Sequence, residues 1–273
     1  MNIRKIFYGE GLTTLGLNKD SYSEAEKAKI PEPLSGQETA LLAEKIFNNT
    51  DNRVAQHMVD SNVILTLSGF KPSTDVFISI AHESEIESVM LEVEKLNSYL
   101  EQTHPDIRIS TSGRPSRKGN LTSIKVNSLL GYERLSKKSR LPGMTPFDSS
   151  TGWEGWWEWY KKVCDDLEEA QEQGKIPKTI HVIGGMIHGY PDQAILDAAD
   201  SEHTDKKMGD VPIPNTGLYN EAEPSFLVYP EHLGDPSIQE YVKQAGQILK
   251  DFYDSEWHKK IAPQLAFHKE ARE

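Results

Sequence analysis

The sequence predicts an α/β protein with a mostly parallel or mixed sheet of about five strands, helices on both faces, and helical additions at both ends. Three observations lead to this fold class. Short runs of β-branched residues recur along the chain, and several longer segments have apolar residues at intervals of three and four. One strand, helix and strand also follow each other at the spacing of a βαβ unit. The 273 residues, 37% of them hydrophobic, are enough to bury a sizeable core.

The chain begins with a segment that we expect to be an arm. Residues 1–34 have mixed polarity and end in a proline-containing stretch. Ser35 and Glu38 then have the spacing of a capping box, which predicts the start of a helix. A second short helix is expected around 54–59. These signals divide the chain into an N-terminal arm and a single α/β domain over 35–273.

The first half of this domain predicts the βαβ unit. Residues 63–70 are rich in β-branched residues and predict a strand, and apolar and polar residues alternate in a second strand at 76–80. The short break between them leaves a hairpin or a parallel pair open. Apolar residues at helical spacing over 86–100 predict a helix, and 107–110 predicts the returning strand. A parallel sheet with a right-handed crossover is the default for this order.

The second half continues the alternation of strands and helices. Its predicted elements are a helix at 153–172, a strand at 179–183 that runs into two glycines, a short helix through 200, a strand at 225–229 and a helix at 236–252. Residues 201–224 are polar and show no periodicity, so we expect a lid or a disordered loop there.

Positive charge is concentrated in one segment. Between Arg108 and Arg140 the chain has nine basic residues and a single acidic residue, Glu133, so this segment carries +8 in a protein of −12. Such segregation concentrates anions. Hydroxyl and cationic side chains that suit phosphate or carboxylate recognition lie at its centre: Ser112, Arg114, Arg117 and Lys118. The alternative is a solvated loop that contacts the acidic remainder of the protein.

Tryptophans are also clustered, with four of the five between residues 153 and 159. Three of them and Tyr160 follow helical spacing, which predicts a helix face buried against the sheet. A stacking platform for a base or sugar and a partner interface are the alternatives. Trp159 lies off this stripe, so we expect it to be the exposed tryptophan and the ligand-contacting one.

Polar residues that follow the predicted strands are the candidates for catalysis. His82 and His188 fit proton transfer near neutral pH, with Asp192 as the carboxylate near His188 and Tyr190 as a ligand-contacting residue. A structural histidine is the alternative. The glycine-rich turn over 183–192 has the layout of a phosphate cradle but lacks the dinucleotide-binding and P-loop patterns. No pattern predicts a metal site, a nucleophilic serine or a particular cofactor.

These features favour a protein that binds a small anionic ligand, such as a nucleotide or sugar phosphate, at the carboxyl ends of the strands. Histidine acid–base chemistry would apply if it is an enzyme. One alternative is a non-catalytic module that docks an acidic protein through segment 108–140 and the Trp159 region. Another is a single-stranded nucleic-acid binder, since an isoelectric point near 5.3 argues against duplex binding.

The expected compartment is the cytoplasm. A single cysteine, Cys164, excludes an internal disulfide framework and suits a reducing environment. No apolar run approaches the roughly 20 residues that span a bilayer, so we expect no membrane partner.

Overall fold

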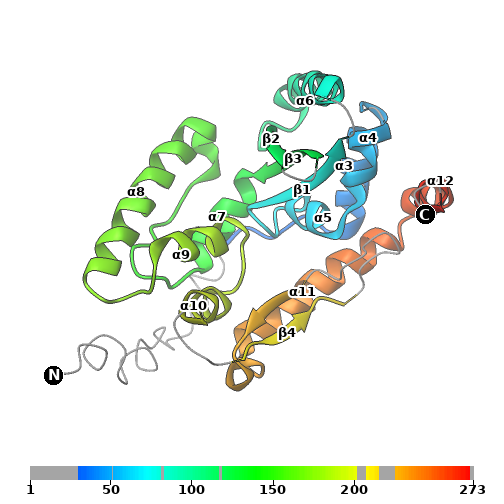
Figure 1. Cartoon of the computed structure of the whole chain (residues 1–273). Helices are drawn as coiled ribbons and strands as arrows, with labels where there is room; N and C mark the ends of the chain where they lie inside the picture. The colour runs from blue at the N-terminus through cyan, green and yellow to red at the C-terminus, as the bar shows by residue number, and fades with distance from the viewer. Residues whose placement is uncertain are drawn as a thin grey trace.

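The computed structural model of the chain describes residues 30–50, 52–80, 83–116, 119–201, 207–214 and 225–270. Helices dominate these residues, together with one three-stranded antiparallel sheet and one antiparallel strand pair (Figure 1). The predicted fold class is therefore wrong, because the described residues form no sheet of about five mostly parallel strands. The division into an arm over 1–34 and one domain over 35–273 stays a prediction.

The helices of the first half are α3 (Gly36–Asn48), α4 (Asn52–Ala55), η2 (Gln56–Val59), α5 (Ser61–Leu67), α6 (Glu83–Thr103) and α7 (Leu129–Lys138). Those of the second half are η3 (Ser149–Thr151), α8 (Gly152–Glu172), α9 (Thr179–Ile187), α10 (Asp192–Ser201), η4 (Pro230–His232), α11 (Pro236–Tyr253) and α12 (Glu256–Glu270). The strands are β1 (Ser73–Ile80), β2 (Ile107–Ser116), β3 (Gly119–Ser128), β4 (Gly209–Pro212) and β5 (Ser225–Val228).

Two predicted helix starts are confirmed in atomic detail. The Ser35 N–H donates to Glu38 at 2.8 Å, and the Glu38 N–H donates back to the Ser35 hydroxyl at 3.3 Å, which completes the capping box of α3. The Asp235 carboxylate accepts from the Ser237 N–H at 2.8 Å and caps α11. Local hydrogen bonding alone sets both helix starts, so the sequence pattern was sufficient to locate them.

The predicted strand–helix–strand unit exists as β1, α6 and β2, but its strands are not neighbours. Strand β3 lies between them and pairs antiparallel with both, in the order β1-β3-β2. Strands β1 and β2 therefore run in the same direction without sharing hydrogen bonds. Strand β3, which the sequence analysis did not predict, is what turns an expected parallel pair into an antiparallel sheet.

The two faces of this sheet differ in chemistry because side chains alternate along each strand. Ile109 and Val126 are paired across β2 and β3 and are almost fully buried on one face. Arg108 pairs with Asn127 at the next position, so these two side chains lie on the other face. We call this second side the polar sheet face.

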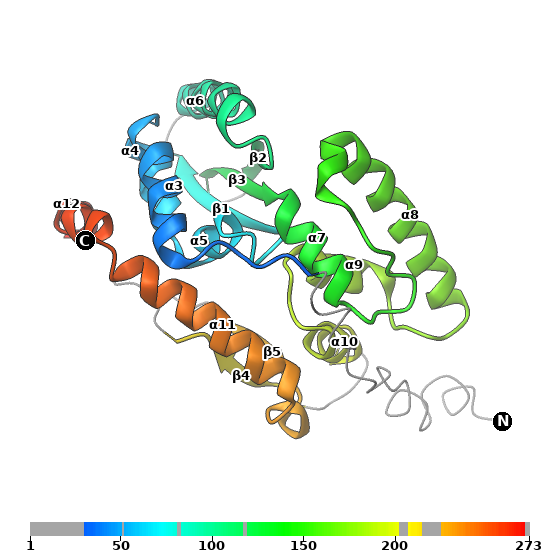
Figure 2. The ribbon, with the colours of Figure 1, turned by 180° about the vertical axis from the view of Figure 1, so that it is seen from behind.

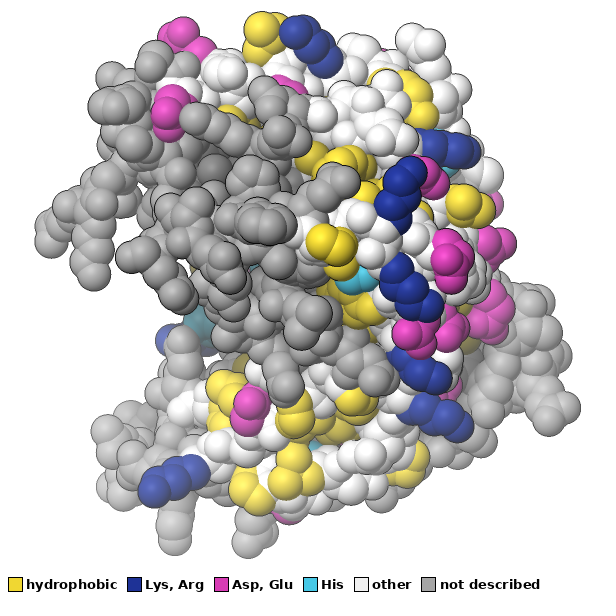
Figure 3. Space-filling view, turned by 90° about the vertical axis from the view of Figure 1, so that its right-hand side faces the viewer, with side chains coloured by type: hydrophobic (Ala, Val, Ile, Leu, Met, Phe, Trp, Pro, Cys, Tyr) yellow, Lys and Arg dark blue, Asp and Glu magenta, His cyan; other side chains and the backbone are white. Residues whose placement is uncertain are grey.

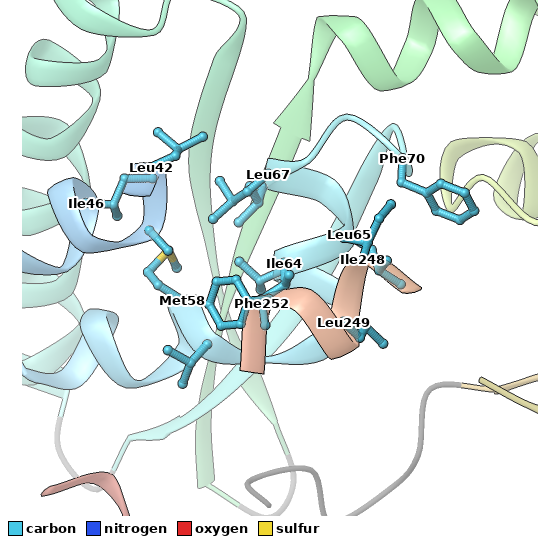
Figure 4. Close-up of a cluster of buried hydrophobic side chains, with 14 of the residues drawn as sticks. Leu42, Ile46, Met58, Ile64, Leu65, Leu67, Phe70, Ile248, Leu249 and Phe252 are labelled. Atoms are coloured by element: carbon cyan, nitrogen blue, oxygen red, sulfur yellow. The ribbon is translucent and has the colours of Figure 1, made fainter. Parts of the chain in front are cut away.

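The apolar sheet face belongs to the larger of two cores. Figure 4 shows its centre, where side chains from α3, η2, α5 and α11 meet. Helix α5 includes the residues 63–67 that were predicted as a strand, and this prediction is wrong. The Asp60 side chain caps α5 by accepting from the Asn62 N–H at 2.8 Å. A short apolar run has no periodicity that separates a buried strand from a helix buried on all sides, and Val63, Ile64 and Leu65 are all fully buried.

The smaller core lies between α7, α8, α9 and α10. Residues 179–183, predicted as a strand, are the start of α9, so this prediction is wrong too. The helix packs closely on α10: a Cβ added at Gly185 would lie 2.8 Å from Ile195. The Thr179 hydroxyl also donates to the Gln171 side chain in the first turn of α9. These two tertiary contacts outweigh the β-propensity of the segment.

The two cores give the molecule two sides. In Figures 1 and 2, α8 stands on one side of α7, while α11 lies beside the β4–β5 pair on the other. Figure 3 shows the face that points away from α8, where described acidic and basic side chains lie intermixed. The arrangement separates the tryptophan-bearing helix α8 from the larger core and places it over the polar sheet face.

Close packing of α7 on the chain before β1 holds these two sides together. A Cβ at Gly131 would lie 2.2 Å from the Lys71 carbonyl oxygen. We expect Gly131→Ala to lower the free energy of unfolding by about 1–3 kcal/mol, because the added methyl group forces the backbone apart. Gly184→Ala is the control: its methyl group meets nothing within 4 Å, and alanine should raise helix stability by about 0.5–1 kcal/mol. Urea denaturation measures both, and a neutral Gly131→Ala would contradict the packing argument.

Candidate functional site

A cavity of about 270 Å³ opens between the polar sheet face and helix α8. Its lining comes from β2, β3, α7, α8 and α9: Arg108, Ser110, Lys125, Asn127, Tyr132, Trp153, Trp156, Tyr160 and Ile187. None of these nine described residues is acidic. The cavity thus combines a polar floor with aromatic walls, the composition typical of small-molecule sites.

The sheet register places the polar residues of the floor. Arg108 is opposite Asn127, and Ser110 is opposite Lys125, across β2 and β3. All four share one face through the alternation of the strands. Among the residues that the structure describes, neither Arg108 nor Lys125 forms an ion pair. Two cations therefore face the cavity without a described ion pair, although Asp75 is opposite Lys125 across β1 and β3.

Helix α8 supplies the aromatic wall. Trp156 and Tyr160 are one helical turn apart and stack with ring centroids 5.3 Å apart. The Trp153 indole N–H donates to the Pro105 carbonyl at 2.9 Å, which ties α8 to the chain just before β2. The Arg108 guanidinium lies 5.3 Å from the centre of the Trp153 ring. This cation–π contact holds the arginine at the mouth of the cavity.

One polar atom in the wall lacks a partner. The indole N–H of Trp156 is buried and has no acceptor among the described residues. The Tyr132 hydroxyl, by contrast, donates to the Asn127 side chain at 3.4 Å. Leaving a buried donor unsatisfied costs about 1–3 kcal/mol. The Trp156 N–H is therefore an unsatisfied donor inside the aromatic wall, without access to the cavity.

Trp159 is not the exposed tryptophan, so that prediction is wrong. It is 7% exposed, packs in the smaller core against Phe147, and donates its indole N–H to the Thr145 carbonyl at 2.7 Å. Trp157 is 51% exposed instead. The error arose because the buried face of α8 is wider than the stripe: Trp159 lies in the smaller core, and Trp153, Trp156 and Tyr160 pack against the same core while they line the cavity.

Most of the predicted anion-binding residues have side chains outside the described part of the chain. Ser112 and Arg114 are in β2, at positions paired with Ser123 and Leu121. Their side chains lie outside the described residues, as do Arg117, Lys118 and the proposed catalytic residue His82. The assignment of these five residues therefore stays a prediction.

The described basic residues of segment 108–140 lie in several different surroundings. Arg108 and Lys125 line the cavity, whereas Arg134 is buried in α7 and donates to the Pro31 carbonyl. Lys137 pairs with Glu133 one helical turn away. The described cations of this segment thus do not form one continuous patch, because α7 turns its own cations away from the sheet.

His188 ends α9 beside the polar sheet face. Its Nε2 lies 4.0 Å from a carboxylate oxygen of Asp75, which is opposite Lys125 in the sheet register. Burial lowers the pKa of His188, and the nearby Lys71 and Lys125 lower it further, against the opposing effect of Asp75. The imidazole is therefore neutral at neutral pH, as a general base requires, and its role in proton transfer stays a prediction.

Asp192 does not accompany His188. Its carboxylate accepts from the Ser139 hydroxyl at 2.8 Å and from the Arg140 N–H, which ties the start of α10 to the loop after α7. Burial raises the pKa of Asp192 to about 6, although these two hydrogen bonds oppose the shift. The sequence placed this carboxylate at a helix start correctly, but its partners come from a distant loop.

Tyr190 is half-buried and contacts a buried lysine. The Lys71 ammonium lies 5.1 Å from the centre of the Tyr190 ring and donates to the Asn62 side chain at 2.8 Å. Burial lowers the pKa of Lys71 to about 8, although Asp60 opposes this shift. Tyr190 is not among the residues that line the cavity, and its ring centroid lies 6.1 Å from that of His188.

Sequence reasoning missed Lys125, Asn127 and Tyr132 as parts of a site. The signal was the alternation of Ile124 and Val126 with polar residues, which is typical of a strand with one buried face. The density of basic residues indicates a charged segment, whereas this alternation of apolar and polar residues indicates the strand β3.

The described residues contain neither a metal-binding cluster nor a membrane-spanning helix. No three histidine, cysteine or acidic side chains are close enough to hold a metal ion, and no helix is long and apolar enough to cross a membrane. Comparison with family models, curated proteins and solved structures finds no match for this chain. The geometry of the site is therefore the basis for proposing a function.

The lowered pKa of Lys71 predicts a pH dependence of stability. Between pH 8 and 10.5 the folded state holds Lys71 neutral while the unfolded state is protonated, so wild-type stability should rise with pH from this group. Lys71→Met lacks this contribution. We expect the stability of the variant relative to wild type to fall by about 1 kcal/mol per pH unit between pH 8.5 and 9.5. Urea denaturation at several pH values measures it, with the exposed Lys162→Met as control. A difference independent of pH would contradict the prediction.

Proposed function

We propose that this protein binds a small anionic molecule, with a phosphate or carboxylate group, in the cavity between the polar sheet face and α8. The observation that carries the proposal is that the cavity lining contains cationic side chains and no acidic one. Arg108 and Lys125 offer cationic donors that form no ion pair within the described residues. Charge-assisted hydrogen bonds from such donors are the strong contacts by which proteins hold anions.

The aromatic walls of the cavity favour a particular chemistry for the rest of the ligand. Trp153, Trp156 and Tyr160 offer ring surface next to the cations, so the part of the ligand adjoining the anionic group packs on aromatic rings. This site differs from the one that the sequence analysis favoured. An antiparallel sheet has no common carboxyl edge, and the floor is instead the middle of one face.

The interaction-module alternative is weaker in this structure. It required an exposed Trp159, which is buried, and a continuous basic surface over 108–140, whose described cations are dispersed. Trp157 is exposed on α8 and would be the remaining aromatic contact. The small-ligand proposal uses Arg108 and Lys125 in the arrangement that they have.

Single substitutions of the cavity donors test the proposal. We expect Arg108→Ala and Lys125→Ala each to weaken binding of inorganic phosphate or acetate at least tenfold, since each removes a charged donor. Trp156→Phe keeps a ring beside Tyr160 and removes only a buried N–H, so it should leave the affinity for these anions almost unchanged. Isothermal titration calorimetry at low salt measures the affinities.

The control for these variants is Lys162→Ala, which removes an exposed cation of α8 that pairs with Asp166 away from the cavity. It should bind the anions as wild type does. If neither anion binds wild type, or if Lys162→Ala is as weakened as Lys125→Ala, the proposal is wrong.

A further inference from the structure

A second hollow adjoins the cavity on the outer side of α8. It has a volume of about 550 Å³ and is lined by Arg108, Trp153, Glu154, Gly155, Trp157 and Glu158. Arg108 and Trp153 line both spaces, so the cavity and the hollow share a wall. A molecule bound at Arg108 in the cavity is therefore adjacent to the hollow.

The hollow has the opposite charge preference to the cavity. Glu154 and Glu158 are four residues apart on α8 and lie on the same side of the helix. Two carboxylates at this spacing repel each other by a few tenths of a kcal/mol on an exposed helix unless a cation lies between them. Lys161 pairs with Glu158 at 2.7 Å, whereas Glu154 forms no ion pair within the described residues.

The aromatic rings of the hollow also suit a cation. The Arg108 guanidinium lies 5.3 Å from the Trp153 ring centre, and the Lys161 ammonium lies 5.8 Å from that of Trp157. Both rings thus already contact positive groups of the chain itself. Tryptophan faces attract cations most strongly among aromatic side chains, and quaternary ammonium groups are bound in this way. Trp157 is 51% exposed, which leaves much of its surface for a ligand.

Resting on the proposed function, we infer that the ligand is a small zwitterion whose anionic group occupies the cavity at Arg108 and Lys125 and whose ammonium group lies in the hollow between Trp157 and Glu154. The charges of the two spaces match such a molecule end to end. A phosphorylated amino alcohol such as phosphocholine has this chemistry, and it occurs both free and as a lipid headgroup.

Three probes of graded chemistry test the inference by isothermal titration calorimetry on the full chain. Inorganic phosphate reports on the cavity alone, glycerol 3-phosphate adds a neutral hydroxyl-bearing part, and phosphocholine adds a cationic one. We expect phosphocholine to bind at least tenfold more tightly than glycerol 3-phosphate.

Variants of the hollow locate the gain. Glu154→Gln and Trp157→Ala should each reduce the preference for phosphocholine to below threefold and leave the affinity for inorganic phosphate unchanged, because neither residue lines the cavity. Trp157→Phe, which keeps an aromatic face, should retain part of the preference. Glu168→Gln removes an exposed carboxylate farther along the same helix, and should behave as wild type.

The outcomes separate the two proposals. If phosphate binds but phosphocholine and glycerol 3-phosphate bind equally, the zwitterion inference is overturned and the anion site stands. If no phosphate-bearing probe binds, both are overturned. Given a preference for free phosphocholine, co-sedimentation of the protein with phosphatidylcholine vesicles assigns the source to a lipid headgroup, and its absence assigns it to the free molecule.

Discussion

The position of β3 between β1 and β2 is the constraint on which the rest of the structure depends. Because β3 is antiparallel to both neighbours, a single register aligns the side chains of all three strands into an apolar and a polar face. A slip of β3 by one residue would move Lys125 into the larger core and Ile124 into the cavity. The burial of Ile124 and Val126 therefore fixes the position of the cavity floor.

Two cations near this sheet, Lys71 and Arg134, are bound mainly by neutral partners. Lys71 is bound by the Asn62 side chain and the Tyr190 ring, and Arg134 by the Pro31 carbonyl. The carboxylate nearest to Arg134 is that of Glu32, which is exposed and 3.9 Å away. Carbonyl and ring contacts satisfy the donors but leave the net charge. Burial lowers the pKa of His188, and the charges of Lys71 and Lys125 lower it further, while Asp75 opposes this shift.

The sequence predicted those elements whose boundaries depend on local chemistry. The capping box of Ser35 and Glu38, the Asp235 cap and the long amphipathic helices α6, α8 and α11 were all found from patterns within a few residues. The errors lie where tertiary surroundings decide. Residues 63–67 are buried on all sides of α5, so no local period marks them as helical. In α9 only Thr179, Val182 and Met186 are buried, and this helical spacing was outweighed by the β-branched residues of 179–183.

The candidate site was only partly predictable for the same reason. The tryptophan stripe on α8 and the concentration of basic residues were both visible, and Arg108 and Lys125 belong to that segment. Their meeting depends on β3, which was not recognised, and on the fold-class error that placed ligands at parallel strand ends. Charge density marked a segment of 33 residues, whereas strand alternation selects which two of its cations face the cavity.

The unpartnered Trp156 N–H is an energetic cost inside the aromatic wall of the cavity. A protein of this kind is stable by about 5–15 kcal/mol, so an unsatisfied buried donor that costs about 1–3 kcal/mol is a sizeable fraction of the total. Phenylalanine at this position would keep the stacking on Tyr160 and the contact with Tyr132 without that cost. The larger indole also contacts Trp153 and Trp157, so its packing within the aromatic wall offsets part of the cost of the unsatisfied donor.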